Sequence, residues 1–341
     1  MGFDGLTGQD SVKKRLLKIV SSGGGARSLL FEGPEGVGKH LFAKETAKAF
    51  LCMDPGPDGA CGKCASCKYI EAGTHPDLIE VEPTEGRKNI RVADLRAVMQ
   101  DAEIKPQISE RKVLIINADR TENVCQNLML KSLEEPSSHL IYILLCSDTS
   151  RIIPTVMSRV TEIPFREYEE NEMIAILKEN GGEDLDDGRL SFLSTFSSKI
   201  PGKAIKLMSD PDFMDEREHI FDLIMNMPRM GYTDILYDEF QYFDRNHDKT
   251  AELLLLLVWT LGDIASAIAV PDPGNIKNSD KKEQVMDFVS HNPSVTLVNI
   301  CNAQEAVSDF ADASHVNATF EVNCCNMLLR IYKELHHEKN S

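Results

Sequence analysis

Eight residues near the amino end constrain the fold of this chain more than any other segment. Residues 33–40 have the sequence GPEGVGKH, after a short apolar run at 28–31 and before a helical pattern that continues to Leu51. A G-x-x-x-x-G-K loop between a strand and a helix points backbone N–H groups at a polyphosphate, and its lysine reaches the outer phosphates. The residues predicted to bind nucleotide are Gly33, Pro34, Glu35, Gly36, Val37, Gly38, Lys39 and His40.

Two positions that hold Mg²⁺ in ATP-hydrolysing loops of this kind are changed. His40 stands where a Ser or Thr hydroxyl ordinarily follows the lysine, and imidazole is a poor ligand for so hard a cation. The apolar run 112–116 ends in Asn117-Ala118 instead of an acidic pair, with Asp119 one position further on. We expect ATP or ADP as the ligand, weak Mg²⁺ binding and little hydrolysis. An active ATPase that uses His40 or Asp119 is the alternative.

Four of the nine cysteines form a second motif. Cys52, Cys61, Cys64 and Cys67 have the spacing C-x8-C-x2-C-x2-C. Four thiolates close the tetrahedral coordination sphere of Zn²⁺ and leave no open catalytic position, so the predicted zinc is structural. An iron–sulfur cluster and unliganded thiols remain the alternatives on spacing alone.

Length and charge limit the classes of function. A chain of 341 residues predicts two or three domains, and a net charge of -17 argues against a stand-alone nucleic-acid binder. Any DNA contact is therefore expected to be shared with partners. The longest apolar run, 253–261, is shorter than the ~20 residues that a membrane span needs, and we interpret it as a core helix. No signal-peptide pattern opens the sequence, so we expect a cytoplasmic protein without a membrane partner.

Apolar runs alternate with helical patterns as far as residue 166. This alternation predicts a parallel sheet flanked by helices, with ligands at the carboxyl ends of the strands. The expected strands are 28–32, 77–82, 112–117, 140–146 and 160–165, and the expected helices are 38–51, 92–102 and 123–134. Short helices are predicted at 170–180, 189–196 and 202–208, and the pattern is helical from about 213 onward.

Several segments together resemble one known family. They are the loop 33–39, the four cysteines, HPD at 75–77, LKSLEEP at 130–136 and IPTVMSR at 153–159. Their order is similar to that in bacterial clamp-loader AAA+ subunits of DNA polymerase III, over residues 1 to about 210. Residues 316–318 and 328–330 are similar to the last helices of the family. Because the Mg²⁺ positions are degenerate, the delta-prime branch is the better match and the gamma/tau motor branch is the alternative.

The resemblance implies a fold and a set of partners. It implies an AAA+ domain at 1–167 with a zinc module at 52–67, a small helical lid domain at 168–211 and an all-α collar domain at 212–341. Delta and gamma/tau subunits would complete a hetero-oligomeric ring that places a sliding clamp on primer-template DNA. A zinc-organised adaptor that never binds nucleotide is a third reading.

The resemblance also assigns residues. Arg159 would reach the nucleotide of a neighbouring subunit, although the family's Ser-Arg-Cys is Ser158-Arg159-Val160 here. Lys203 would meet the chain's own nucleotide, and Ser147 or Asp148 would supply a polar sensor. Without the resemblance, Arg159 is a surface arginine before an edge strand and Lys203 a solvated lysine at a helix start. His75 is expected to order the turn before Asp77, and Glu134-Glu135 to be solvated or in an interface.

Overall fold

The computed structural model describes residues 2–22, 25–84, 86–270, 272–314 and 319–336. They divide into two compact units, which are Met1–Asn180 with Ser197–Ala204, and Gly181–Phe196 with Ile205–Ser341. The first unit contains the sheet, and the described elements of the second are all helical. The family-like segment 316–318 lies outside the described residues.

The first unit is built on a five-stranded parallel sheet. Its strands are β1 (Ser28–Glu32), β2 (Leu78–Val81), β3 (Lys112–Asn117), β4 (Leu140–Cys146) and β5 (Thr161–Pro164), in the spatial order β2-β3-β4-β1-β5. The central strands are apolar at nearly every position because helices cover both faces of the sheet. The predicted parallel sheet with flanking helices is confirmed.

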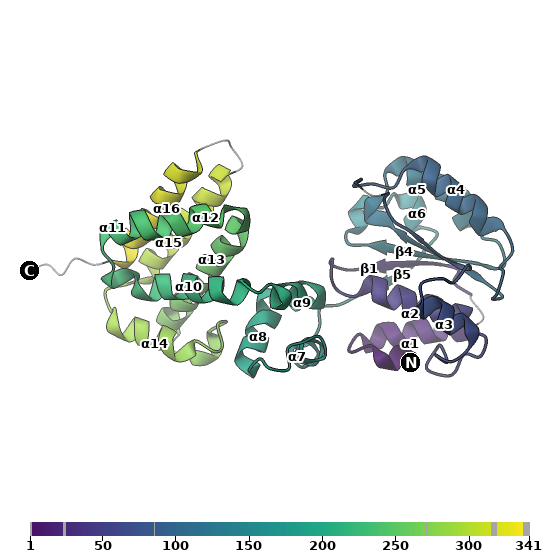
Figure 1. The fold of residues 1–341 in the computed structure, drawn as a ribbon, viewed down its shortest axis with the longest axis horizontal. Coiled ribbons are helices and arrows are strands. Elements are labelled where there is room, and N and C mark those ends of the chain that lie inside the picture. Colours follow the sequence, from purple (N-terminus) through teal and green to yellow (C-terminus); the bar gives the residue numbers. More distant parts are fainter. Residues whose placement is uncertain (1, 23–24, 85, 271, 315–318, 337–341) are drawn as a thin grey trace, which may run out of the picture. The chain divides into compact units, whose positions relative to one another are not determined.

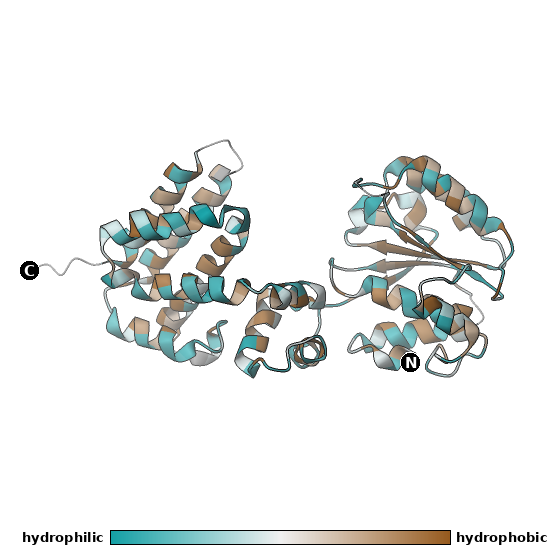
Figure 2. Cartoon of the chain, viewed as in Figure 1, coloured by the Kyte–Doolittle hydropathy of each residue, from teal (hydrophilic) through white to brown (hydrophobic). Residues whose placement is uncertain are grey.

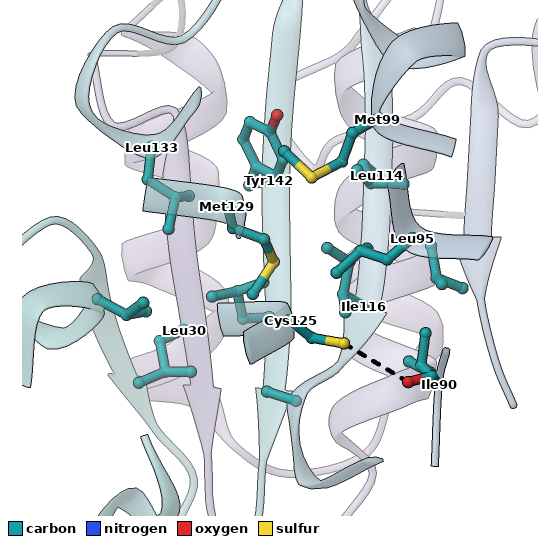
Figure 3. Close-up of a cluster of buried hydrophobic side chains, with 14 of the residues drawn as sticks. Leu30, Ile90, Leu95, Met99, Leu114, Ile116, Cys125, Met129, Leu133 and Tyr142 are labelled. Atoms are coloured by element: carbon teal, nitrogen blue, oxygen red, sulfur yellow. Dashed lines mark hydrogen bonds between the residues drawn. The ribbon is translucent and has the colours of Figure 1, made fainter. Parts of the chain in front are cut away.

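Helices cover both faces of this sheet. On one face lie α1 (Asp10–Ser21), α2 (Lys39–Leu51) and α3 (Ala65–Glu71), and on the other lie α4 (Val92–Glu103), α5 (Asn123–Glu134) and α6 (Pro154–Met157) (Figure 1). The strands are mostly hydrophobic, whereas the helices alternate along their length (Figure 2). Between the sheet and helices α4 and α5 lies one cluster of buried hydrophobic side chains (Figure 3). Its members include Leu30, Leu95, Met99, Leu114, Met129, Leu133 and Tyr142.

The register of the central strands brings three loops together. Glu32 at the end of β1 pairs with Cys146 at the end of β4, and Asn117 at the end of β3 pairs with Leu145. The loop after β1 and the turns η2 (Ala118–Arg120) and η3 (Thr149–Arg151) therefore start from the same edge of the sheet. This carboxyl edge is where parallel α/β sheets bind ligands.

Helices α7 to α9 follow the sheet. They are α7 (Glu170–Glu179), α8 (Asp187–Phe196) and α9 (Pro201–Ser209). Helix α7 starts at a capping box, in which the Glu169 side chain accepts from the backbone of Glu172 and the Glu172 side chain accepts from the backbone N–H of Glu169. Helix α7 and the first turn of α9 belong to the first unit, and α8 belongs to the second.

The remaining α-helices also belong to the second unit. They are α10 (Phe213–Asn226), α11 (Tyr232–Asp234), α12 (Phe240–Arg245), α13 (Thr250–Ala269), α14 (Lys282–His291), α15 (Leu297–Ser314) and α16 (Phe320–Leu335). Helix α13 is central, because it contacts α10, α14 and α15. The collar role of this unit stays a prediction.

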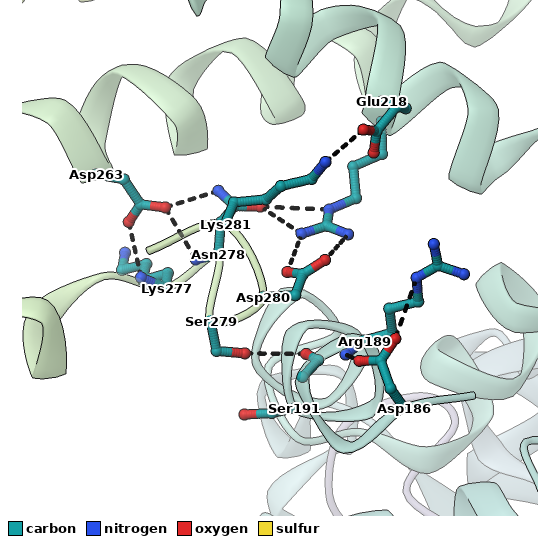
Figure 4. A network of polar contacts seen from close by, with 12 residues as sticks. Asp186, Arg189, Ser191, Glu218, Asp263, Lys277, Asn278, Ser279, Asp280 and Lys281 are labelled. Carbon is teal, nitrogen blue, oxygen red and sulfur yellow. Dashed lines mark hydrogen bonds and ion pairs between the residues drawn. The ribbon is translucent and has the colours of Figure 1, made fainter. Parts of the chain in front are cut away.

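A polar network fixes the segment between α13 and α14 (Figure 4). Arg217 of α10 donates to both carboxylate oxygens of Asp280, at 2.9 and 2.5 Å, and to Asn278 Oδ1 at 3.0 Å. Asp263 of α13 accepts from the backbone N–H and the side-chain amide of Asn278, at 2.9 and 2.7 Å. The Arg217 guanidinium also lies over the ring of Phe192, 3.7 Å from its centroid.

One described helix, His247–Ala269, is long and apolar enough to cross a membrane by length and composition. It extends well beyond the apolar run 253–261 that suggested a core helix. Half of its most apolar window is buried within the protein. Its Asp263 is fully buried and hydrogen-bonded inside the helical unit, as in the core helix of a water-soluble fold.

Candidate functional site

The loop after β1 has the geometry of a phosphate cradle. Gly36 and Gly38 have φ angles of 87° and 100°, a region that glycine adopts without strain, and α2 begins at Lys39. Lys39 Nζ donates to the carbonyl oxygens of Gly33 at 2.5 Å and Pro34 at 3.0 Å. Burial lowers the pKa of Lys39, and the nearby Asp119 partly offsets this effect. These hydrogen bonds hold the Lys39 ammonium group against the phosphate-binding loop.

A cavity of about 370 Å³ opens beside this loop. It combines the loop with side chains from the ends of β3 and β4, so the sheet edge and the loop form one site. Its lining residues are Glu35, Gly36, Gly38, Lys39, His40, Leu41, Asn117, Asp119, Arg120, Leu145, Ser147 and Arg151. Of the eight predicted loop residues, Gly33, Pro34 and Val37 do not line it.

His40, the residue after the loop lysine, contacts an acidic side chain outside the loop. His40 Nε2 lies 2.7 Å from Glu80 Oε2 on β2, and Lys44 Nζ lies 3.2 Å from the other oxygen of the same carboxylate. The imidazole therefore has an acidic partner of its own. It supplies no hydroxyl oxygen to the loop, so this position does not fit Mg²⁺.

The end of β3 offers little more to a metal. Asn117 and Ala118 occupy the positions of the acidic pair, and both oxygens of Asp119 accept from the backbone N–H of Ser147, at 3.0 and 2.9 Å. Asp119 thus lines the cavity and is hydrogen-bonded to the residue that follows β4. This edge therefore offers one hydrogen-bonded carboxylate in place of the acidic residues that hold Mg²⁺ in P-loop ATPases, so its donor set does not fit that kind of site.

The two sensor candidates after β4 have different surroundings. Ser147 lines the cavity, whereas the Asp148 carboxylate accepts from the backbone N–H of Ser150 at 2.9 Å and so caps η3. Ser147 is therefore the residue that faces the loop. Sequence reasoning left this choice open because adjacent residues at a strand end cannot be oriented without the turn.

The first turn of α9 contacts the loop closely. The Gly202 N–H donates to Gly36 O at 2.9 Å, and a Cβ on Gly202 would lie 2.8 Å from Gly36 Cα. Only glycine fits that approach without a shift of the loop. Lys203 is exposed, and it is not among the residues that line the cavity. The predicted role of Lys203 in nucleotide binding therefore stays a prediction, supported only by the contact of the adjacent Gly202 with the loop.

The four motif cysteines come together, as a metal site requires. Their Sγ atoms all lie within 4.8 Å of one another, and Cys52 Sγ is 3.9 Å from Cys64 Sγ and 3.7 Å from Cys67 Sγ. Four ligands at the usual Zn–S distance around a tetrahedral ion would be separated by about 3.8 Å. Backbone N–H groups of Lys63 and Cys64 donate to Cys61 Sγ and lower the pKa of that thiol to about 6. The cluster fits tetrahedral zinc.

A buried network underlies the cysteine cluster. Ser66 and Ser109 both donate to Leu51 O, at 2.7 and 2.9 Å, and His75 Nε2 lies 2.9 Å from Ser66 Oγ. His75 Nδ1 accepts from the Asp77 N–H at 3.0 Å. Because the serine protons are committed to Leu51 O, Nε2 carries the histidine proton and donates. His75 orders the turn before Asp77, as expected, and it supports the residues next to Cys52 and Cys67.

Arg159 lies two residues after the end of α6 and two before the start of β5. Its Nη1 donates to Thr155 O at 2.7 Å and to Ser158 Oγ at 3.0 Å, and its Nη2 pairs with the Glu134 carboxylate at the end of α5. About a third of the Arg159 side chain is exposed. Within its own unit it is not among the residues that line the loop cavity.

A larger cavity, of about 950 Å³, lies in the second unit between α13, α15 and α16. Its lining is mainly apolar, with Leu254, Val258 and Phe310 among its members. It has no phosphate-binding loop and no paired carboxylates, so its size does not make it the functional site.

The parallel sheet, its glycine-rich loop and the polar groups at its carboxyl edge define a P-loop α/β protein of the AAA+ type. Residues 8–169 match the family model described as "DNA polymerase III, delta subunit". The chain is similar to the delta' subunit of DNA polymerase III from Pseudomonas aeruginosa, with 39% identity over 138 residues, 40% of this chain and 42% of that protein. The matched part thus spans less than half of this relative.

Two Bacillus subtilis proteins extend the comparison. The delta' subunit is 27% identical over 321 residues, which cover 92% of this chain and 93% of that protein. The tau subunit is 32% identical over 165 residues, 48% of this chain and 29% of that protein. The chain is thus similar to delta' and tau subunits of DNA polymerase III, and the likeness to the delta' subunit of Bacillus subtilis covers most of both chains.

Proposed function

We propose that this chain is a hydrolysis-deficient, delta'-like subunit of the DNA polymerase III clamp loader that supplies Arg159 to the ATPase site of a neighbouring subunit. It would contribute to the polymerase holoenzyme without an ATPase of its own. The observation that carries the proposal is the contrast between an intact phosphate loop and a sheet edge whose donor set does not fit Mg²⁺. The fold of a nucleotide-binding protein is kept, but the residues for hydrolysis are missing.

The position of Arg159 supports action in trans. Its guanidinium lies on the surface after α6, away from the lining of the chain's own cavity. An arginine stabilises a transferring phosphoryl group through its fixed fork of N–H donors. A neighbouring subunit that docks against this surface would therefore receive a positive charge that its own nucleotide site lacks.

The partners follow from the family. We propose delta and gamma/tau subunits as the other members of a hetero-oligomeric ring, with the sliding clamp and primer-template DNA bound by the whole assembly. The net charge of -17 supports a shared DNA contact, because a single acidic chain has little to neutralise phosphates with. The second unit would hold the ring together as a collar, and α7 to α9 would form the lid.

An active motor ATPase is the second candidate, because the tau subunit of Bacillus subtilis is among the relatives. It would require His40 or Asp119 to replace the missing Mg²⁺ ligands. The hydrogen bonds of these two side chains to Glu80 and to Ser147 argue against it.

The trans role can be tested in a reconstituted loader. The ring is assembled with wild-type chain or with Arg159→Ala, and ATPase is measured with clamp and primed DNA present. We expect turnover at the neighbouring site to fall by roughly tenfold or more, a conservative figure for arginines of this kind. Arg96→Ala, an exposed arginine on α4, is the matched control and should leave turnover unchanged.

Assembly is checked by size-exclusion chromatography, so that a failure to form the ring is not mistaken for lost catalysis. If both variants assemble and turn over ATP at the wild-type rate, Arg159 does not act in trans and this part of the proposal is wrong.

A further inference from the structure

Two basic side chains at the loop cavity have no role so far. Arg120 and Arg151 line the same cavity as Lys39, and they lie in the turns η2 and η3 that follow the neighbouring strands β3 and β4. Because β3 and β4 end side by side, these two turns present their arginines at the same edge of the sheet. Neither arginine belongs to the phosphate-loop motif.

The arginines are available to a ligand. In the described part of the chain, the Arg120 guanidinium makes no hydrogen bond or ion pair, and Arg151 interacts electrostatically with Asp148. Asp148 is itself committed to the cap of η3. Both arginine side chains are exposed at the cavity, where an incoming anion can reach them.

The cavity also lacks the ligands for the Mg²⁺ ion that usually neutralises a polyphosphate. A nucleoside triphosphate carries about four negative charges, two of which Mg²⁺ normally neutralises while it bridges the outer phosphates. Here the position after Lys39 holds His40, which pairs with Glu80, and Asp119 is bonded to Ser147. Without another cation, a bound triphosphate would leave most of its charge uncompensated.

We propose that this site binds nucleoside di- or triphosphates without Mg²⁺, with the guanidinium groups of Arg120 and Arg151 in place of the metal. Two guanidinium groups supply the two positive charges of Mg²⁺, and each can donate two parallel hydrogen bonds to phosphate oxygens. The inference rests on the proposed function, and it names the ligand of the same loop as metal-free nucleotide.

The test is nucleotide affinity with and without magnesium. Binding of ATP and of ADP to the purified full chain is measured by isothermal titration calorimetry, first in excess Mg²⁺ and then in buffer freed of divalent ions on a chelating resin. The resin treats the buffer only, because a chelator such as EDTA in solution would also strip zinc from the cysteine cluster. Lys39→Ala serves as the variant without a working loop.

For the wild-type chain we expect affinities that agree within about threefold in the two buffers, since the positive charge comes from the protein. The double variant Arg120→Gln, Arg151→Gln should bind about tenfold or more weakly in metal-free buffer, because charge-assisted hydrogen bonds to phosphate are lost. Glutamine keeps most of the side-chain length, and circular dichroism verifies the fold. Arg96→Gln, on the exposed face of α4, is the matched control for net charge and should bind normally.

Three results would overturn the inference: binding that requires Mg²⁺, no binding in either buffer, or an equal loss of affinity in the Arg96 control. These results are distinct from failure of the proposed function. The trans role is measured at the neighbour's site with Arg159→Ala, and that effect can persist even if this loop binds no nucleotide.

Discussion

Glu134, the last residue of α5, forms an ion pair with Arg159, which lies two residues after the end of α6. The pair joins two segments that the sequence patterns single out separately, LKSLEEP and IPTVMSR. The sequence left open whether Glu134 is solvated or lies in an interface, and the structure shows that it pairs with Arg159. The carboxylate neutralises the arginine while no phosphate is near it.

This pairing predicts how Glu134→Gln behaves in an assembled loader. Arg159 keeps its orientation through Nη1, which donates to Thr155 O and Ser158 Oγ, while Nη2 loses its competing partner. Exposed ion pairs contribute up to about 1 kcal/mol, so the ATPase of the neighbour should rise by at most about fivefold. Steady-state turnover with clamp and DNA checks this, with Glu135→Gln as the control. A fall comparable to that of Arg159→Ala would instead show that Glu134 positions the arginine.

The cysteine cluster predicts one zinc per chain. Replacing the buried Cys67 by Ser should abolish metal binding and loosen the module 52–67, because a structural zinc site supplies folding free energy. Mass spectrometry of the metal content, with a colorimetric zinc-release assay, measures the stoichiometry. Cys301→Ser, at an exposed position on α15, should retain the full content. Iron in place of zinc, or no metal in the wild-type chain, would contradict this account.

The Arg217–Asp280 pair predicts a stability effect in the second unit. The side chain of Arg217 is 3% exposed and that of Asp280 15%, so Asp280→Asn leaves a buried guanidinium without its anion. We expect a loss of roughly 3 kcal/mol in the free energy of unfolding. Hydrogen exchange at α10 and α14 locates the loss within the chain. Asp287→Asn, at an exposed position on α14, should change little.

The same pair predicts a dependence on pH. Burial alone would raise the pKa of Asp280, but the hydrogen bonds and charge of Arg217 outweigh it and hold the pKa below the ordinary 3.8. A depressed pKa in the folded state means that the contribution to stability is complete above the unfolded value and is lost as the pH falls through the folded value. The stability difference between wild type and Asp280→Asn should therefore shrink below about pH 4. A difference that does not vary between pH 2 and 7 would argue that the carboxylate is not charged in the fold.

The sheet was predictable because its signals are local. Runs such as 113–116 and 140–146 are continuously apolar, as strands covered on both faces must be, and the glycine spacing of the loop identifies the turn after β1. Helix α1 was not predicted. Its apolar residues Val12, Leu16, Ile19 and Val20 do recur at helical spacing, so the signal for this helix was present in the sequence.

The arrangement of the site was less predictable, because it depends on contacts between distant segments. The approach of Gly202 to Gly36, the bond of Asp119 to Ser147 and the pairing of His40 with Glu80 join residues from different loops and strands. Gly202 stood out in the sequence only as the start of a short helix. Arg120 and Arg151 follow strand ends without any motif, so only the order β2-β3-β4-β1-β5 places them beside the loop.

Phosphate release by the purified chain tests the central claim most directly. The chain is incubated with radiolabelled ATP and Mg²⁺, and Lys39→Ala is run beside it to measure background. The account predicts that wild type releases phosphate no faster than Lys39→Ala, because the donor set at the loop does not fit Mg²⁺. Steady Mg²⁺-dependent release that the Lys39→Ala variant lacks would contradict it and identify the chain as an active motor.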